Sequence, residues 1–118
     1  MLDELERRLG GAATTTLIEH LVEIFLRDTP ERIAAIESAV QAGDAGALQE
    51  AAHALRGSNT LLGGAGRIAE LCAVLEEISG TNSVEGAAQP AGALQEAFEV
   101  TSEALVRQVD DRTRLSAD

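Results

Sequence analysis

Residues 45–62, AGALQEAAHALRGSNTLL, are the stretch that decides the fold, and they lie between Asp44 and the glycine-rich run at 63–66. Asp is a favoured N-cap residue and glycine a favoured helix terminator, so the sequence predicts one helix from about Ala45 to Leu62. At about 100° per residue, one stripe of this helix lies within roughly 60° of Leu48. We expect this stripe to be buried, and it comprises Leu48, Ala51, Ala52, Leu55, Asn59 and Leu62.

The opposite side of the same helix carries the candidate chemistry. His53 falls about 140° from Leu48, so its imidazole is predicted to face solvent. Inside a helix, glycine costs about 1 kcal/mol relative to alanine, and at an exposed position no neighbouring helix requires a small residue. Gly57 therefore indicates a surface cleared for another protein to approach the imidazole. The neighbours of His53 on this side are Gln49, Arg56, Gly57 and Thr60.

An exposed imidazole beside a guanidinium can take part in group transfer. Histidine is a nucleophile that forms covalent intermediates. Arg56 adds a permanent cation whose planar fork can hold phosphoryl oxygens bidentately. From these residues alone a second interpretation stays open, in which His53 is an ordinary solvated side chain.

Upstream of this stretch, one or two helices are predicted after a short charged helix over residues 2–9. An N-cap among Thr14 to Thr16 begins the next helix. Pro30 either kinks that helix or starts a new one, which ends at Gly43. Helical spacing predicts a buried stripe made of Leu17, Leu21, Ile24, Phe25, Ile33, Ile36 and Val40.

Downstream, two more helices are predicted. One runs from about Arg67 to Ser79, and residues 80–92 form a loop whose Pro90 opens the last helix. The chain is expected to fray from Asp111. The buried positions of these helices are Ile68, Leu71, Cys72, Leu75, Ile78, Leu94, Phe98, Leu105 and Val109.

These elements predict an all-α fold, an antiparallel four-helix bundle at residues 14–110. A lead segment or short helix at 1–13 precedes it, and a tail at 111–118 follows. With two Phe and neither Tyr nor Trp, the apolar residues are mainly Ala, Leu, Ile and Val, which suits close helix packing. A chain of 118 residues is the size of one domain.

Charge and composition exclude several classes of function. The formal net charge is −11 and all nine basic residues are Arg, which disfavours nucleic acid and anionic membranes. No apolar run approaches the roughly 20 residues of a membrane span, and the N-terminus lacks a signal-peptide pattern. The single Cys72 cannot form an internal disulfide, so we expect a cytoplasmic protein. Neither zinc nor calcium spacing is present, so no metal or other cofactor is expected in this chain.

The segment His53-Ala54-Leu55-Arg56-Gly57-Ser58, followed by Leu62-Gly63, resembles the signature of histidine-containing phosphotransfer (HPt) domains. Residues 67–76, RIAELCAVLE, are similar to the following helix of that family, and FLRDTPE at 25–31 and AGD at 42–44 are also typical of it. The resemblance covers roughly residues 15–110. It implies a four-helix bundle that carries a phosphoryl group on a histidine within a multistep His-Asp phosphorelay.

The resemblance also implies roles for individual residues. His53 would be the phosphorylation site, through Nε2, and Arg56 would steady the phosphoryl group. Gly57, with Gln49 and Thr60, would give a partner access, and Ser58 would support local hydrogen bonding. A Gln or Glu on the neighbouring helix orients the histidine in this family. Glu76 is the candidate here, but the glycine turn is one residue longer than usual, which leaves its register open.

The implied partners are a response-regulator receiver domain, a hybrid histidine kinase, or both. The receiver would supply the aspartate and Mg²⁺, so the chain is expected to be a monomeric phosphotransfer intermediate rather than an enzyme with its own ATP-binding domain. The alternative is a binding module of the same fold that carries no phosphate. The dimerisation helices of a histidine kinase are disfavoured because an acidic residue usually follows their histidine, whereas Ala54 follows His53.

Overall fold

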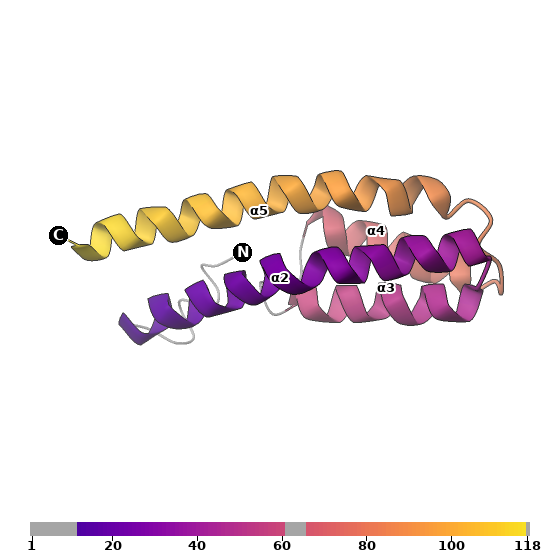
Figure 1. The fold of residues 1–118 in the computed structure, drawn as a ribbon, viewed down its shortest axis with the longest axis horizontal. Coiled ribbons are helices and arrows are strands. Elements are labelled where there is room, and N and C mark those ends of the chain that lie inside the picture. The colour runs from indigo at the N-terminus through magenta and orange to yellow at the C-terminus, as the bar shows by residue number, and fades with distance from the viewer. Residues whose placement is uncertain (1–11, 61–65, 118) are drawn as a thin grey trace.

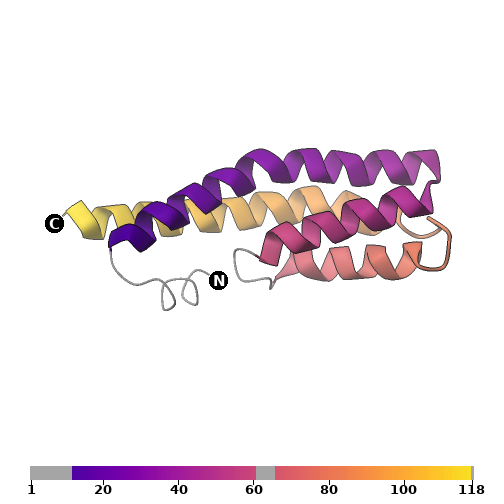
Figure 2. The same cartoon turned by 90° about the horizontal axis from the view of Figure 1, so that it is seen from below.

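The computed structural model describes residues 12–60 and 66–117, with side chains described for residues 16–59 and 66–111. Its helices are α2 (Ala12–Ala42), α3 (Ala45–Thr60), α4 (Arg67–Ser79) and α5 (Ala88–Ala117). α3 packs against α2 and α4, and α5 also packs against α2 and α4, so each helix has two neighbours. Consecutive helices run in opposite directions (Figures 1 and 2). The predicted antiparallel four-helix bundle is therefore confirmed; the predicted lead helix at 2–9 lies outside the described residues.

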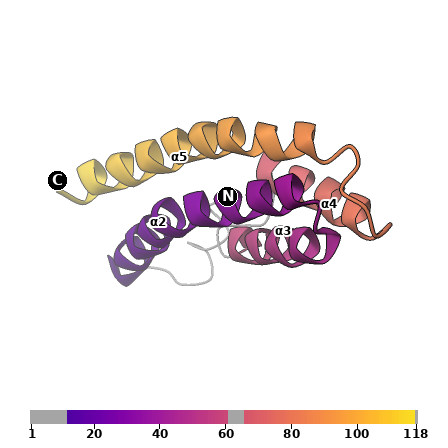
Figure 3. The same cartoon turned by 45° about the vertical axis from the view of Figure 1, so that its right-hand side comes forward.

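The four helices differ greatly in length. α2 has 31 residues and α5 has 30, whereas α3 has 16 and α4 has 13. Because each helical residue rises about 1.5 Å, α2 spans about 46 Å and α3 only about 24 Å. The two long helices consequently continue past the ends of the two short ones, and the molecule measures 53 × 22 × 17 Å (Figures 1 and 3).

In the first turns of α2, the buried face is shifted by one position from the predicted one. Leu17 is 38% exposed, whereas Ile18 and Val22 are buried together with Phe25. The predicted burial of Phe25, Ile33 and Ile36 is confirmed. The helical repeat from Leu17, however, leads through Leu21 and Ile24 to Asp28 and Glu31, which are charged. The apolar stripe that passes through Ile18 and Val22 continues along α2 to the buried Ile33. Burial of the longest apolar stripe therefore decided the rotation of the helix.

α2 also begins earlier than predicted and passes through its proline. The helix starts at Ala12, so Thr14 to Thr16 lie inside it rather than at its N-cap. Alanines are the strongest helix formers, which favours extension into residues 12 and 13. Pro30 lies within the helix, where it has no N–H to donate to the carbonyl of Leu26. Figure 2 shows the axis of α2 bending along its length, as expected for an internal proline.

The junction of α2 with α3 is a tight helix end followed directly by an N-cap. Gly43 has a φ of +69°, and the amide of Asp44 donates to the Ala39 carbonyl at 3.0 Å, which is a Schellman-type helix end. Asp44 Oδ1 then accepts from the amide of Ala47 at 3.0 Å, so the predicted N-cap of α3 is confirmed.

The α4–α5 connection is shorter than the predicted loop at 80–92. α5 begins at Ala88, and Pro90 lies in its first turn, where its missing N–H is not needed. The intervening residues form tight turns with Asn82 at φ 62° and Gly86 at φ 85°. The backbone of α5 is helical as far as Ala117, and residues 111–117 contain neither proline nor glycine; the expected fraying from Asp111 stays a prediction.

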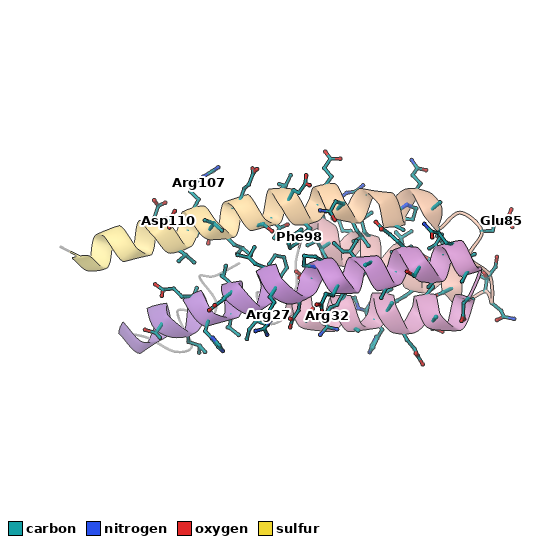
Figure 4. All side chains as sticks on the ribbon, viewed as in Figure 1. Arg27, Arg32, Glu85, Phe98, Arg107 and Asp110 are labelled. Atoms are coloured by element: carbon teal, nitrogen blue, oxygen red, sulfur yellow. The ribbon has the colours of Figure 1, made fainter. Side chains whose placement is uncertain are left out.

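The core is made of aliphatic side chains from all four helices. Phe25 and the half-buried Phe98 contact each other with ring centroids 5.4 Å apart. On the outside of α5, Arg107 and Asp110 point away from the bundle (Figure 4). None of the helices in the described ranges is long and apolar enough to cross a membrane.

The predicted core is confirmed in α3, α4 and α5 by the burial of Leu48, Ala52, Leu55, Asn59, Ile68, Leu71, Cys72, Leu75, Leu94 and Leu105.

Candidate functional site

His53 lies in the middle of α3 and faces solvent, as the helical wheel predicted. Its side chain is 72% exposed, whereas Ala52 and Leu55 on the other side of the helix are completely buried. The Asp44 cap and the buried stripe together hold α3 in this orientation. The imidazole is therefore presented outward from a rigid helix in the bundle.

Glu76 on α4 contacts the imidazole directly. Its Oε1 lies 2.9 Å from His53 Nδ1, and the Glu76 side chain is only 16% exposed. Because an ionised carboxylate only accepts hydrogen bonds, this contact requires Nδ1 to carry the proton. In the neutral ring, Nε2 then holds the available lone pair. The register that the sequence left open thus places Glu76 beside His53 rather than on a solvated flank.

The same carboxylate also binds Arg56. Arg56 Nη1 lies 3.0 Å from Glu76 Oε2, in a geometry that makes an ion pair without an aligned hydrogen bond. The Arg56 side chain is 46% exposed. One carboxylate on α4 therefore holds two side chains of α3, one through each oxygen.

Sequence analysis did not predict the Arg56–Glu76 ion pair. Arg56 follows His53 by three residues, so both side chains project toward the same neighbouring helix. An acidic residue at that level of α4 was the available signal, but helical periodicity alone does not align two different helices.

The other predicted site residues lie on α3 within two turns of His53. Gln49 and Gly57 are exposed, and a Cβ added at Gly57 would have nothing within 4 Å. No packing requirement therefore accounts for this glycine in the described structure. Ser58 Oγ donates to the Leu55 carbonyl at 3.1 Å, which is a local contact. α3 is described as far as Thr60, whose side chain lies outside the described residues, as do the predicted helix end and buried position at Leu62.

Cys72 lies in the core one helical turn before Glu76. It has no exposed surface, as predicted for a core residue. Burial, followed by the negative charge of Glu76, raises the pKa of the Cys72 thiol to about 12, although Arg56 acts in the opposite direction. The thiol is therefore protonated at neutral pH and is not a nucleophile of the site.

We expect Cys72 to resist alkylation by iodoacetamide at pH 8 in the folded protein and to react fully in urea, as read by intact mass. A thiol with a pKa raised by folding favours the folded state below its unfolded pKa of about 8.5, and this contribution is lost as pH rises toward 12. Urea unfolding of a Cys72→Ala variant should show a weaker decline of stability above pH 9. Rapid labelling of the native protein at pH 8 would contradict this account.

The second histidine of the chain, His20, does not join the site. His20 is exposed on α2, and its sequence position places it several turns from the level of His53. Within residues 12–60 and 66–117, no group of three His, Cys, Asp or Glu side chains is arranged to hold a metal ion.

The fold and this arrangement define a class: an all-α bundle that presents one oriented histidine on its surface. The chain matches the family model described as Hpt domain over residues 20–110, and it therefore belongs to the Hpt domain family. Comparison with curated proteins and with solved structures gave no match. Membership in the family carries a phosphotransfer-related role in two-component signalling, with receiver domains or kinases as partners.

Proposed function

We propose that this chain is a phosphocarrier that accepts a phosphoryl group on His53 from a receiver-domain aspartate and donates it to another. The observation that carries this proposal is the 2.9 Å contact of Glu76 with Nδ1 of an imidazole that is 72% exposed. This contact supports the tautomer in which Nε2 carries the free lone pair and can act as the nucleophile. The exposure of the ring allows a second protein to reach that nitrogen.

The transfer step needs little from this chain. The Nε2 lone pair attacks the phosphorus of the aspartyl phosphate, an N–P bond forms, and the P–O bond breaks with its electron pair leaving on the aspartate carboxylate. The Nδ1 proton stays in its hydrogen bond to Glu76, whose negative charge stabilises the positive charge that develops on the ring. The same logic operates where a carboxylate supports a catalytic histidine. Donation is the reverse sequence.

Surrounding residues supply charge and access. Phosphoryl transfer depends chiefly on positioning and on stabilisation of charge. Arg56 provides a permanent cation beside the ring. The exposed surface at Gly57 and Gln49 leaves space beside the imidazole for a receiver domain to dock. We propose that the aspartate and Mg²⁺ belong to the receiver, so that this chain carries the group without a cofactor or an ATP-binding domain of its own.

The decisive experiment mixes the chain with a receiver domain that has been charged with acetyl phosphate and then desalted. Intact mass should show one added phosphoryl group on the chain, stable to base and labile to acid, as expected of a phosphoramidate bond. If neither the receiver nor phosphoramidate labels the chain, the carrier role is wrong and a binding module without phosphate is the better account. A label that resists acid would instead indicate Ser or Thr.

A further inference from the structure

Arg32 on α2 is a half-buried arginine whose Nε is buried and makes no hydrogen bond. Among the side chains that the structure describes, its guanidinium also makes no ion pair. Arg27, Arg56 and Arg67, by contrast, each pair with a carboxylate. A buried donor without an acceptor carries a desolvation cost, which a partner that supplies the acceptor can recover.

The acidic residue one turn before Arg32 on the same helix is already engaged. Asp28 Oδ1 accepts a hydrogen bond from Arg27 Nε at 2.9 Å. This hydrogen bond is the main cause that lowers the pKa of the Asp28 carboxyl, whereas Arg32 contributes only as a more distant charge. Arg32 therefore remains available to an acceptor that comes from another molecule.

Arg32 lies beside the turn of α3 that follows His53. Together with Ser58 of α3, it lines a partly open cavity of about 100 Å³ between the two helices. Ser58 is five residues after His53, which corresponds to about 7.5 Å along the helix axis. Figure 4 shows Arg32 on the side of α2 that borders α3.

Small side chains cover α3 between His53 and this cavity. At about 100° per residue, Gly57, Ala54 and Ser58 follow one another around the helix from His53 toward α2. Ala54 and Gly57 are exposed, and Ser58 is half-buried. A receiver surface that reaches the imidazole can therefore extend across α3 to Arg32 without meeting a long side chain at this level.

The size of a protein interface makes contact with Arg32 expected. Even a small specific interface buries about 600 Å² on each partner, which is a patch roughly 25–30 Å across. A patch of this width centred on His53 also covers the neighbouring helices, because packed helices lie about 8–10 Å apart. Glu50, the acidic residue on the same flank of α3, lies one turn before His53, so the edge beyond Gly57 is the cationic one.

We propose that Arg32 is a docking residue that binds a carboxylate side chain of the receiver domain at the α2 edge of the interface. This inference rests on the proposed carrier function and names one contact by which the chain selects its partner. A guanidinium binds a carboxylate through two parallel N–H donors, and Nε with one Nη forms such a fork. In the complex, the buried Nε gains the acceptor that it lacks in the free chain.

The test compares Arg32→Lys, Arg32→Gln and Arg32→Glu with the parent chain. The donor is a receiver domain that has been charged with acetyl phosphate and labels the parent, and intact mass measures the transfer efficiency, kcat/KM. Arg32→Gln should lower this efficiency by about tenfold, the lower end of what close interfacial charge pairs contribute. Lys keeps the charge and should lose less, whereas Glu repels the carboxylate and should lose more. Phosphoramidate does not dock, so it should label all four proteins equally.

Arg107→Gln is the matched control, because it removes the same charge from a side chain of α5 that points away from the bundle (Figure 4). It should accept the phosphoryl group at the parental rate. Parental transfer by Arg32→Gln would overturn the inference. Slower labelling of Arg32→Gln by phosphoramidate would also overturn it, since Arg32 would then act on the chemistry. A parent chain that neither donor labels would refute the proposed function instead, which is a distinct result.

A second measurement uses only the parent chain and so does not depend on a variant at position 32. The Nε–Hε resonances of Arg32 and Arg107 are followed by NMR while the receiver domain is added. The Arg32 resonance should shift and its hydrogen exchange with water should slow, whereas the Arg107 resonance should not change. An Arg32 resonance that stays unchanged while those of His53 shift would overturn the docking contact.

Discussion

Replacing His53 with Gln is expected to abolish phosphoryl acceptance, from one group per chain to none, while the fold remains intact. The side chain is 72% exposed and contributes nothing to the core, so its loss creates no cavity. Gln is at least as good a helix former as His, and Glu76 keeps its ion pair with Arg56 in the variant. Intact mass after incubation with a charged receiver, together with circular dichroism, measures both parts of this prediction.

The control for this variant is His20→Gln. His20 is exposed on α2 and is the other histidine of the chain, so it is the natural second acceptor. We expect the His20 variant to accept the phosphoryl group at the parental level. Label that persists in His53→Gln and disappears in His20→Gln would move the site to α2 and refute the assignment.

Gly57→Gln is expected to separate docking from chemistry. A Cβ at this position meets nothing within 4 Å, so the variant should fold. Replacing a helical glycine with a good helix former should add roughly 0.5–1 kcal/mol to the free energy of unfolding. The new side chain would nevertheless stand one turn from His53, where a receiver must approach. A displacement of the reacting groups by about 1 Å costs about a hundredfold in rate, so transfer from a receiver should fall by that order.

Two further measurements test whether Gly57→Gln impairs receiver docking rather than the chemistry at His53. Labelling by phosphoramidate should persist, because a small donor does not need the surface around Gly57. Gly92→Gln is the matched control, since Gly92 is also helical and exposed with nothing within 4 Å of an added Cβ, but lies on α5. It should also gain stability without losing transfer. If Gly57→Gln unfolds, the glycine serves packing, and if it transfers normally, the proposed docking surface is wrong.

The parts of the fold that could be predicted are those decided within a few turns of helix. The Asp44 cap and a single apolar stripe in α3 sufficed to place His53 on the solvent side. In α2, by contrast, residues 17–25 contain enough apolar side chains for two overlapping stripes. Burial of Ile18 rather than Leu17 follows from continuity with Ile33 farther along, which a short window does not contain.

The candidate site shows the same division between local and long-range information. His53, Arg56 and Gly57 belong to one helix, so their common face follows from their spacing. Glu76 belongs to another helix, and its height relative to His53 depends on how α3 and α4 pack. The family resemblance named Glu76 as a candidate without fixing its register. Its double contact with His53 and Arg56 became visible only when both helices were placed together.

The unequal lengths of the helices divide the molecule into two zones of different local stability. Where all four helices overlap, a backbone amide can exchange its hydrogen with water only after several packed layers separate. In the overhanging parts of α2 and α5, each described helix has fewer neighbours, so local opening requires less free energy. We expect slow amide exchange around His53 and faster exchange toward Ala12 and Ala117. The overhang can then loosen, or attach to another element, without disturbing the orientation of the imidazole.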